Sequence, residues 1–319
     1  MGAPSDETVE LVVAVKAPIA DGIVALELTG PSGEELPPWT PGAHVDLLLT
    51  DDLERQFSLC GDPADAARWR IAVLRESEGR GGSAFVHDRL AVGDRVRARG
   101  PRNHFPLEPA EEYLFIAGGI GITPLLPMMA KATQDGIEWR LAYGGRRAAS
   151  MAFVDELPGT TEGHVALWPQ DEVGLIDLEG LLVEPRPGCR IYCCGPEPLL
   201  QAVDGLVAGW PPHSLRTERF SPKAHALEGD ASSFVVRLDY SDLEVTVGPD
   251  QSIVDAVEAL GVDVITSCRE GTCGTCETTV LDGVPDHRDS ILSEDEHAAN
   301  DTMMICCSRS HSPVLVLDL

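Results

Sequence analysis

Short runs of alternating apolar and polar residues fill the first third of the chain. They lie at residues 10–16, 23–28, 44–49, 69–74 and 94–98, and clusters of Gly, Pro and Asp separate them. A period of two predicts strands with one buried face, and regular short strands divided by turn residues are typical of a small barrel or sandwich. Residues 9–107 are therefore predicted to form an all-β domain.

The pattern changes after residue 110, where apolar strand runs alternate with helical patterns. Strands are predicted at 113–117, 139–144, 164–168 and 190–194 and near 214–218, with helices at 123–133, 152–157, 177–182 and 198–209. Alternating strands and helices indicate a parallel sheet wrapped by helices. The second domain is therefore predicted to be of the α/β class.

A polar connector at residues 221–231 precedes the last part of the chain, which opens with a predicted hairpin at 234–240 and 243–247. A helix is predicted at 253–260, with Ser252 or Asp250 as its N-cap. A chain of 319 residues suggests two or three domains. We expect three, at 1–107, 108–224 and 225–319.

Four cysteines near the C-terminus have the spacing of plant-type [2Fe–2S] ligands, C-x4-C-x2-C followed by a distant fourth. They are Cys268, Cys273 and Cys276, with Cys306 or Cys307 as the fourth. The last two are predicted to lie on a strand, where neighbours face opposite sides and only one can ligate. Gly271 and Gly274 would allow the sharp turns that aim backbone N–H groups at the sulfurs. The alternative is structural zinc, which more often uses paired C-x2-C hooks.

A candidate site lies in the β domain, where Arg55, Gln56, Phe57 and Ser58 end a strand and resemble a flavin-binding signature of the ferredoxin-NADP reductase superfamily. An Arg can bind a phosphate in bidentate fashion, an aromatic ring can cover a flavin face, and a Ser hydroxyl can hydrogen-bond near flavin N5. The turn at 79–83, Gly-Arg-Gly-Gly-Ser, precedes a predicted helix at 84–90. Unpaired N–H groups at such a helix start favour an anion.

A candidate nucleotide site combines two motifs. Gly118, Gly119 and Gly121, with Thr123 and Pro124, follow a strand and open a helix, which suits backbone approach to a pyrophosphate. Cys194, Gly195 and Pro196 end the penultimate strand of the same predicted sheet. Ligands of such sheets bind at the carboxyl ends of the strands, where both motifs are expected. The alternative is that Cys193 and Cys194 are core residues, because free Cys packs as a small hydrophobe.

With these sites in order, the chain resembles the phthalate dioxygenase reductase family, including reductase components of vanillate O-demethylase and similar Rieske oxygenases. The resemblance extends from about residue 8 to residue 319 and rests on residues 55–58, 79–83, 118–124, 194–196, 218–220 and 268–276. The first of these segments is similar to the Arg-x-Tyr-Ser signature of the ferredoxin-NADP reductase superfamily. Phe57 replaces the usual Tyr, so stacking is kept and a phenol hydrogen bond is lost.

The resemblance implies the domain order flavin-binding antiparallel β-barrel, ferredoxin-NADP reductase-like α/β nucleotide domain, and C-terminal β-grasp ferredoxin. It implies FMN, a hydride route from NAD(P)H, and Cys306 as the fourth cluster ligand. The residues implied at the reacting centre are Ser58, Thr123, Cys194 and Phe220, the last as a shield of the flavin. The implied cofactor-binding residues are Arg55, Gln56, Phe57, Ser58, Val73, Arg75, Gly81, Gly82, Ser83, Gly118, Gly119, Gly121, Thr123, Arg146, Cys194, Gly195, Pro196 and Phe220.

The resulting hypothesis is an NADH-dependent reductase component that feeds single electrons through a [2Fe–2S] cluster to a Rieske non-haem iron oxygenase or a cytochrome P450. One alternative is a non-enzymatic ferredoxin-like carrier on a degenerate reductase scaffold. Another is a flavin reductase that releases reduced flavin, which would need no cluster. NADPH is the alternative nucleotide, because Arg146 and Arg147 could receive a 2′-phosphate. His87, His104 and His287 have no assigned role and are predicted to be surface or packing residues.

The net charge of −28 argues against nucleic acid as a partner. Residues 226–319 hold 19 Asp and Glu against 4 Lys and Arg, which suits steering towards a basic docking patch on a partner protein. A generally acidic proteome is the alternative explanation. No apolar run reaches 18 residues and no basic segment opens the chain, so neither a membrane span nor a signal peptide is expected. A reduced, cytoplasmic monomer is the resulting expectation.

Overall fold

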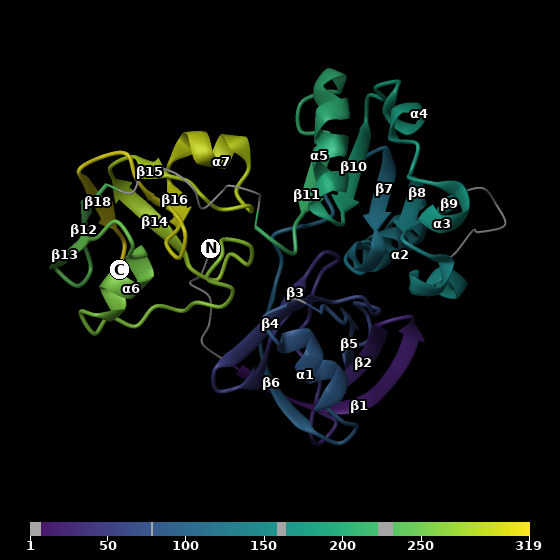
Figure 1. Ribbon diagram of the computed structural model, residues 1–319, viewed down its shortest axis with the longest axis horizontal. Helices are drawn as coiled ribbons and strands as arrows, with labels where there is room; N and C mark the ends of the chain where they lie inside the picture. Colours follow the sequence, from purple (N-terminus) through teal and green to yellow (C-terminus); the bar gives the residue numbers. More distant parts are fainter. Residues whose placement is uncertain (1–7, 78, 158–163, 223–231) are drawn as a thin grey trace. The chain divides into compact units, whose positions relative to one another are not determined.

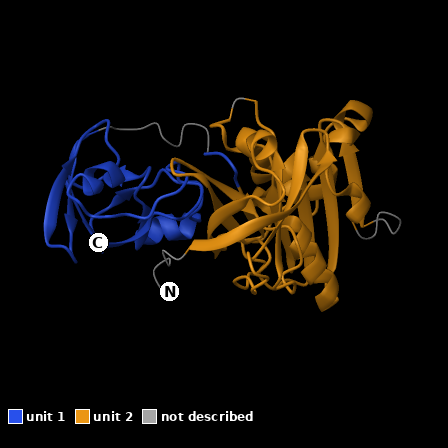
Figure 2. Ribbon diagram, turned by 90° about the horizontal axis from the view of Figure 1, so that it is seen from below, with its two compact units in different colours: residues 1–4, 219–319 blue, residues 5–218 orange. Residues whose placement is uncertain are grey.

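The computed structural model describes residues 8–77, 79–157, 164–222 and 232–319 and contains three large β-sheets (Figure 1). Residues 5–218 form one compact unit, and the remaining residues form the other (Figure 2). The first unit holds an antiparallel sheet and a parallel sheet, and the second holds a mixed sheet. The three sheets fall within the three expected domains, whose borders at 107 and 224 remain predictions.

The first sheet is a closed six-stranded barrel in the order β4-β3-β6-β1-β2-β5. A bridge between Leu59 and Ile71 closes it, and the Cys60 N–H donates to the Arg70 carbonyl at 2.8 Å. Every neighbouring pair is antiparallel, which confirms the predicted barrel. Its elements are β1 (Thr8–Ala20), β2 (Ile23–Thr29), β3 (His44–Thr50), β4 (Leu53–Ser58), β5 (Arg68–Leu74), α1 (Gly82–Asp88) and β6 (Arg95–Arg102).

The second sheet is parallel, with the order β11-β10-β7-β8-β9. Its strands are β7 (Glu112–Gly118), β8 (Glu138–Gly145), β9 (Val165–Pro169), β10 (Cys189–Cys194) and β11 (Leu215–Glu218). The helical elements between them are η1 (Gly119–Ile122), α2 (Leu125–Asp135), η2 (Ala148–Ser150), η3 (Val154–Glu156), α3 (Gln170–Val173), α4 (Leu178–Leu182), α5 (Glu197–Leu206) and η4 (Val207–Gly209). The predicted parallel α/β architecture is therefore confirmed.

One predicted helix of this domain, at residues 152–157, is wrong. Only the 3-10 turn η3 forms there, because Phe153 adopts a left-handed conformation with φ 64° that interrupts helical geometry. The Phe153 ring is buried, and the Arg70 guanidinium lies 4.9 Å from its centroid. Packing of this ring against the barrel therefore takes precedence over the local helical pattern.

The barrel and the parallel sheet share one hydrophobic core. Ile23, Ala72 and Phe105 from the barrel side pack in the same buried cluster as Phe115 and Tyr192 from the parallel sheet. A bidentate ion pair also joins them, with Arg70 donating to both carboxylate oxygens of Glu156 at 2.6 and 2.8 Å. The strand ends of the two sheets are thereby held in fixed positions within this unit.

The second unit has the β-grasp arrangement, with the order β13-β12-β18-β14-β16 and a parallel pair between β12 and β18. Helix α6 buries Ile253, Val254, Ala256 and Val257 in the core of this unit. Ser252 caps α6 by accepting from the Asp255 N–H at 3.0 Å, which selects it over Asp250. The elements are β12 (Phe234–Leu238), β13 (Leu243–Val247), α6 (Ile253–Glu258), β14 (Glu277–Asp282), β15 (Pro285–Asp286), α7 (Glu294–Ala299), β16 (Thr302–Met304), β17 (Arg309–Ser310) and β18 (Val314–Leu317).

Helices in the described part of the chain are all too short or too polar to cross a lipid bilayer.

Candidate functional site

The two nucleotide-type motifs meet at the carboxyl edge of the parallel sheet. β7 and β10 are neighbours, with Ala117 paired to Cys194, so the loops that follow them lie together. A Cβ on Gly121 would be 2.2 Å from the Cys194 carbonyl oxygen, and one on Gly195 would be 2.9 Å from Gly118 Cα. Backbone therefore packs directly on backbone here, as expected for glycine-rich loops that approach a ligand's phosphates.

Substitution of Gly121 by alanine tests this close packing. The added methyl group would overlap the Cys194 carbonyl, so we expect Gly121→Ala to lower stability by about 1–3 kcal/mol and to raise KM for NADH. Thermal unfolding and steady-state kinetics provide the two readouts. Gly205→Ala in α5 is the matched control, because nothing lies within 4 Å of its Cβ position. Equal stability and equal KM values of the two variants would contradict the close packing at Gly121.

Three polar side chains from three strands converge beside this edge. The Cys194 thiol at the end of β10 lies 3.8 Å from Glu218 Oε2 at the end of β11. The Ser58 hydroxyl at the end of β4 also hydrogen-bonds with the Glu218 carboxyl. Cys194 and Ser58 are both buried. The junction thus joins the predicted flavin motif of the barrel to the predicted nucleotide motif of the sheet.

Burial sets the protonation of this junction. Desolvation raises the pKa of Glu218 to about 8, while weaker hydrogen bonds from Cys194 and Ser58 act in the opposite direction. Burial, and then the neighbouring Glu218 carboxyl, raise the pKa of the Cys194 thiol well above its usual value. At pH 7 the carboxyl is mostly protonated and the thiol is neutral. Glu218 is therefore held next to Ser58 mostly in its uncharged form.

Sequence reasoning gave Glu218 no role, although residues 218–220 contributed to the family resemblance. The available signal was its place at the end of a strand of the parallel sheet, at the edge where ligands bind. Thr123 lies at the same edge, where it is 2% exposed and donates from its hydroxyl to the Ile120 carbonyl at 2.9 Å. That bond fixes the turn η1 in front of α2.

The flavin-type motif is built around Arg55. Its guanidinium donates to the Glu54 carbonyl at 2.6 Å and also to the Arg80 carbonyl in the glycine-rich turn. Gly82 admits this side chain, since a Cβ there would be 2.2 Å from Arg55 Cγ. Gly81 has a φ of 85°, which favours glycine. A guanidinium beside a turn of small residues fits a terminal phosphate.

Other predicted cofactor neighbours have the following surroundings. The Gln56 Nε2 atom is buried and has no hydrogen-bond partner in the described part of the chain, which suits a polar ligand atom. Ser83 Oγ accepts from the Glu76 N–H at 3.1 Å. The Arg75 guanidinium is held by both Asp88 carboxylate oxygens at 2.6 and 2.8 Å. The Val73 carbonyl accepts from His87 at 2.9 Å.

Two further predicted residues are exposed. Arg146 follows β8 and is exposed, and its neighbour Arg147 lies 3.4 Å from the Asp21 carboxylate. Phe220 belongs to the second compact unit and is 44% exposed. The roles assigned to these and to the other predicted site residues remain predictions.

The cluster loop between α6 and β14 carries Cys268, Cys273 and Cys276. Gly271 and Gly274 have φ values of 70° and 72°. These positive values confirm the sharp turns that were predicted at the two glycines. The Glu270 and Thr272 N–H groups donate to Cys268 Sγ at 3.3 and 3.4 Å, and the Cys268 N–H donates to Cys273 Sγ at 3.5 Å. Backbone donors aimed at sulfurs are what an iron–sulfur site needs.

The fourth thiol comes from a turn and not from a strand, so the prediction that 306 and 307 lie on a strand is wrong. β16 ends at Met304, whose carbonyl accepts from the Cys307 and Ser308 N–H groups at 3.3 and 3.0 Å and so closes a turn. The Cys306 thiol contacts those of Cys268 and Cys276, whereas Cys307 reaches Cys306 and the Met304 carbonyl. These contacts support Cys306 as the ligand.

The comparisons with known proteins agree with this geometry. Residues 236–311 match the family model of the 2Fe-2S iron-sulfur cluster binding domain. The chain is 42% identical over 94% of its length to the phenoxybenzoate dioxygenase subunit beta of Ectopseudomonas oleovorans and covers 94% of that protein. A solved phthalate dioxygenase reductase, described as a modular structure for electron transfer from pyridine nucleotides to [2Fe-2S], is 36% identical with a TM-score of 0.71 and 98% coverage of both chains.

An intact type IV self-sufficient cytochrome P450 monooxygenase is also similar, with 42% identity, a TM-score of 0.92 and 98% coverage of this chain. The chain spans 41% of that longer protein. Taken together, the fold, the cluster loop and these likenesses define an iron–sulfur oxidoreductase with ferredoxin-NADP reductase-like domains. The chain belongs to the phthalate dioxygenase reductase family, the reductase components of oxygenase systems.

Proposed function

We propose that this chain takes a hydride from NADH onto FMN and delivers single electrons through its [2Fe–2S] cluster to a terminal oxygenase. The observation that carries the proposal is the junction of Ser58, Cys194 and Glu218, which joins the barrel to the nucleotide-type sheet in a chain that also holds the cluster loop. A carrier with a degenerate scaffold would have no need of this junction. The non-enzymatic alternative is therefore not favoured.

Bound FMN would accept two electrons as a hydride and release them one at a time. Arg55 and the turn at Gly81 and Gly82 would hold its terminal phosphate. Buried Thr123 and Cys194 would exclude water from the place where nicotinamide and flavin meet. Protonated Glu218 would keep the place beside Ser58 uncharged, so that the negative charge brought by the hydride is not repelled. The cluster would be held by Cys268, Cys273, Cys276 and Cys306.

The preferred nucleotide in this proposal is NADH. Arg147 already lies 3.4 Å from the Asp21 carboxylate, so one of the two arginines that could bind a 2′-phosphate is partly neutralised. We expect a higher kcat/KM for NADH than for NADPH, and we expect Arg146→Ala to leave the value for NADH within about twofold, since an exposed charge without a bound phosphate contributes little. A large loss with NADPH alone in Arg146→Ala would identify Arg146 as a phosphate ligand. A wild type that prefers NADPH would contradict the proposal.

Two classes of terminal acceptor are proposed. A Rieske non-haem iron oxygenase is the first, supported by likeness to proteins named as dioxygenase components over nearly their full lengths. A cytochrome P450 is the second, supported by the 42% identity and TM-score of 0.92 to the self-sufficient P450. Assay of the purified chain with one acceptor of each class, in the presence of NADH, separates the two.

The proposed acceptor has a basic docking patch. Residues 226–319 carry 19 acidic residues against 4 basic ones, a density that steers a basic partner towards the ferredoxin unit. None of the nine cysteines, all of which lie in the described residues, is in a disulfide, which supports a reducing, cytoplasmic location. We propose a monomer in solution, which light scattering of the purified protein tests.

A further inference from the structure

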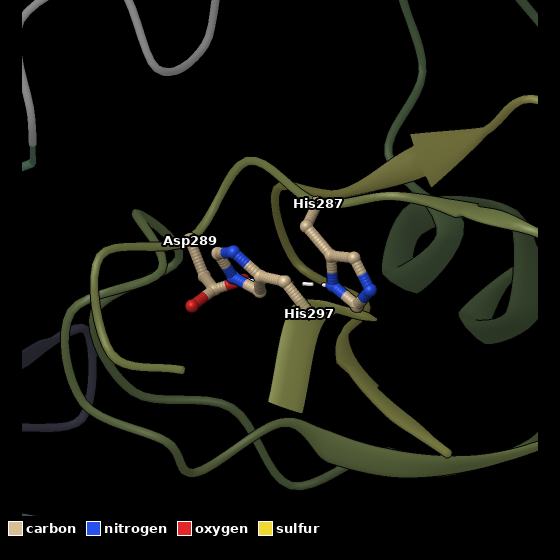
Figure 3. A group of neighbouring side chains, drawn as sticks. All are labelled: His287, Asp289 and His297. Atoms are coloured by element: carbon tan, nitrogen blue, oxygen red, sulfur yellow. Dashed lines mark hydrogen bonds and ion pairs between the residues drawn. The ribbon is translucent and has the colours of Figure 1, made fainter. Parts of the chain in front are cut away.

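Two histidines and an aspartate of the ferredoxin unit converge outside the cluster loop, although His287 was predicted to be only a surface or packing residue (Figure 3). His287 and Asp289 follow β15, and His297 lies on α7. One donor atom from each of the three lies within 4.8 Å of the other two. Imidazole nitrogen and carboxylate oxygen are the ligands that zinc and related divalent metals take in proteins.

His287 gives the decisive observation, because its Nδ1 atom is buried and has no hydrogen-bond partner in the described residues. Its side chain is 8% exposed. Asn300 donates from Nδ2 to the Ala298 carbonyl, so its Oδ1 accepts from His287 Nε2 at 3.1 Å. The proton is thereby placed on Nε2, and the lone pair of Nδ1 is left facing Asp289 Oδ1 at 3.9 Å. Two acceptor atoms therefore face each other, and no donor among the described residues lies between them.

Asp289 is held in place for the same site. Its side chain is fully buried, and Oδ2 accepts from the Ile291 and Leu292 N–H groups at 3.0 and 2.7 Å. Oδ1 is left for the two imidazoles, with His297 Nε2 at 3.1 Å. Asp289 is held by hydrogen bonds to Oδ2, and His287 is held by a hydrogen bond from Nε2. Such support of the atom that does not face the site is typical of metal ligands.

We propose that His287 Nδ1, Asp289 Oδ1 and His297 Nε2 form a site for a divalent transition metal of the zinc class. Metal bonds of about 2.0–2.2 Å can span two ligand atoms up to about 4 Å apart, which covers the gap between His287 and Asp289. When the ion binds, His297 gives up its Nε2 proton and takes one from solvent on Nδ1, so that it binds as a neutral imidazole. Its ring is stacked on that of His287, with centroids 4.5 Å apart, and turns about its side-chain torsions to point its lone pair at the ion. Its 27% exposure leaves room for that turn and for a water ligand.

The site is tied to the cluster loop by backbone contacts. The Ser290 N–H donates to the Gly271 carbonyl at 2.8 Å, and a Cβ on Gly271 would be 2.9 Å from Asp289 Cα. A metal ion bound to Asp289 and to His297 of α7 would therefore fasten α7 to the segment that supports this loop. The ion acts as a structural clamp beside the cluster and takes no part in ligating it.

Calorimetric titration of zinc chloride into the full-length protein tests the site. The protein is first treated with a mild chelator, and its visible spectrum confirms that the iron–sulfur cluster is still loaded, so that the cluster cysteines are not available to zinc. We expect one zinc per chain with micromolar affinity. His297→Ala should weaken that affinity at least about tenfold, because one of three protein ligands is lost.

His311→Ala is the matched control, since His311 is an exposed histidine of the same unit whose Nε2 lies 3.6 Å from an Asp286 carboxylate oxygen. It should bind zinc as the wild type does. Absence of a saturable zinc site in the cluster-loaded wild type would overturn the proposal. Equal affinities of His297→Ala and the wild type, with both spectra intact, would also overturn it, because zinc would then occupy thiols or surface histidines elsewhere.

Discussion

Replacement of Cys273 by serine is expected to abolish electron delivery to cytochrome c while ferricyanide reduction by NADH continues at close to the wild-type rate. Cys273 sits in the middle of the cluster loop, where its sulfur accepts from the Cys268 N–H at 3.5 Å. Without this thiolate the cluster is lost, and the only one-electron route to a protein acceptor is lost with it. Since the cofactors carry the chemistry, we expect a loss of at least about 10²-fold with cytochrome c. Ferricyanide can take electrons directly from the flavin.

The neighbouring cysteines provide the controls. Cys307→Ser should keep the cluster and both activities. Cys306→Ser should behave like Cys273→Ser, because the Cys306 thiol contacts those of Cys268 and Cys276, whereas that of Cys307 reaches Cys306. Loss of the cluster in Cys307→Ser but not in Cys306→Ser would identify Cys307 as the fourth ligand. Wild-type cytochrome c reduction should slow as ionic strength rises, as steering by the acidic ferredoxin unit requires. Loss of both activities in a folded Cys273→Ser protein would contradict the relay.

Replacement of Glu218 by glutamine is expected to leave flavin reduction by NADH close to its wild-type rate at neutral pH and to remove the loss of rate at high pH. The hydride carries its own hydrogen to the flavin, so Glu218 acts by keeping its surroundings uncharged, since a carboxylate there would repel the negative charge that the hydride brings. Burial raises the pKa of Glu218 to about 8, so the carboxyl holds its proton below pH 8 and loses it above. The wild-type rate should therefore be highest at neutral pH and should fall as pH rises through about 8. Glutamine cannot titrate, so that fall should be absent from the variant. Stopped-flow measurement of flavin bleaching across pH provides the readout.

Glu138→Gln is the matched control for this experiment. Glu138 is exposed at the start of β8, the opposite end of the strands from the site. It should leave both the rate and the pH profile unchanged. A Glu218→Gln protein that keeps the wild-type pH profile would show that the charge of another group sets the pH dependence.

The fold followed closely from sequence pattern where one face of an element is buried. The barrel strands and the parallel strands could be predicted from the spacing of their apolar residues, whereas their irregular ends could not. β1 runs from Thr8 to Ala20, beyond its alternating part, because register shifts between Val13 and Val15 and between Pro18 and Ala20 bend it along its partner. The helix expected at 152–157 failed because Phe153 packs against the barrel in a left-handed conformation.

Site residues that lie close together in the sequence could also be predicted, whereas those brought together only by the tertiary fold could not. The glycine-rich loops and the three-cysteine loop are contiguous, so their turns and backbone donors could be predicted. Glu218 could not be assigned, because its role depends on Ser58, a distant residue of the barrel, and on burial that raises its pKa. Cys306 and Cys307 were placed on a strand because their local run is apolar, and the turn closed by the Met304 carbonyl is set by tertiary structure.

The central claim is that the flavin, nucleotide and cluster sites of this chain form one continuous path for electrons. An anaerobic visible spectrum of the purified protein, recorded before and after addition of NADH, tests it most directly. We predict bands of oxidised flavin and of a [2Fe–2S] centre that bleach together when NADH is added. Cluster bands that stay unchanged by NADH, even after FMN is supplied, would contradict the account and would leave only a ferredoxin-like carrier.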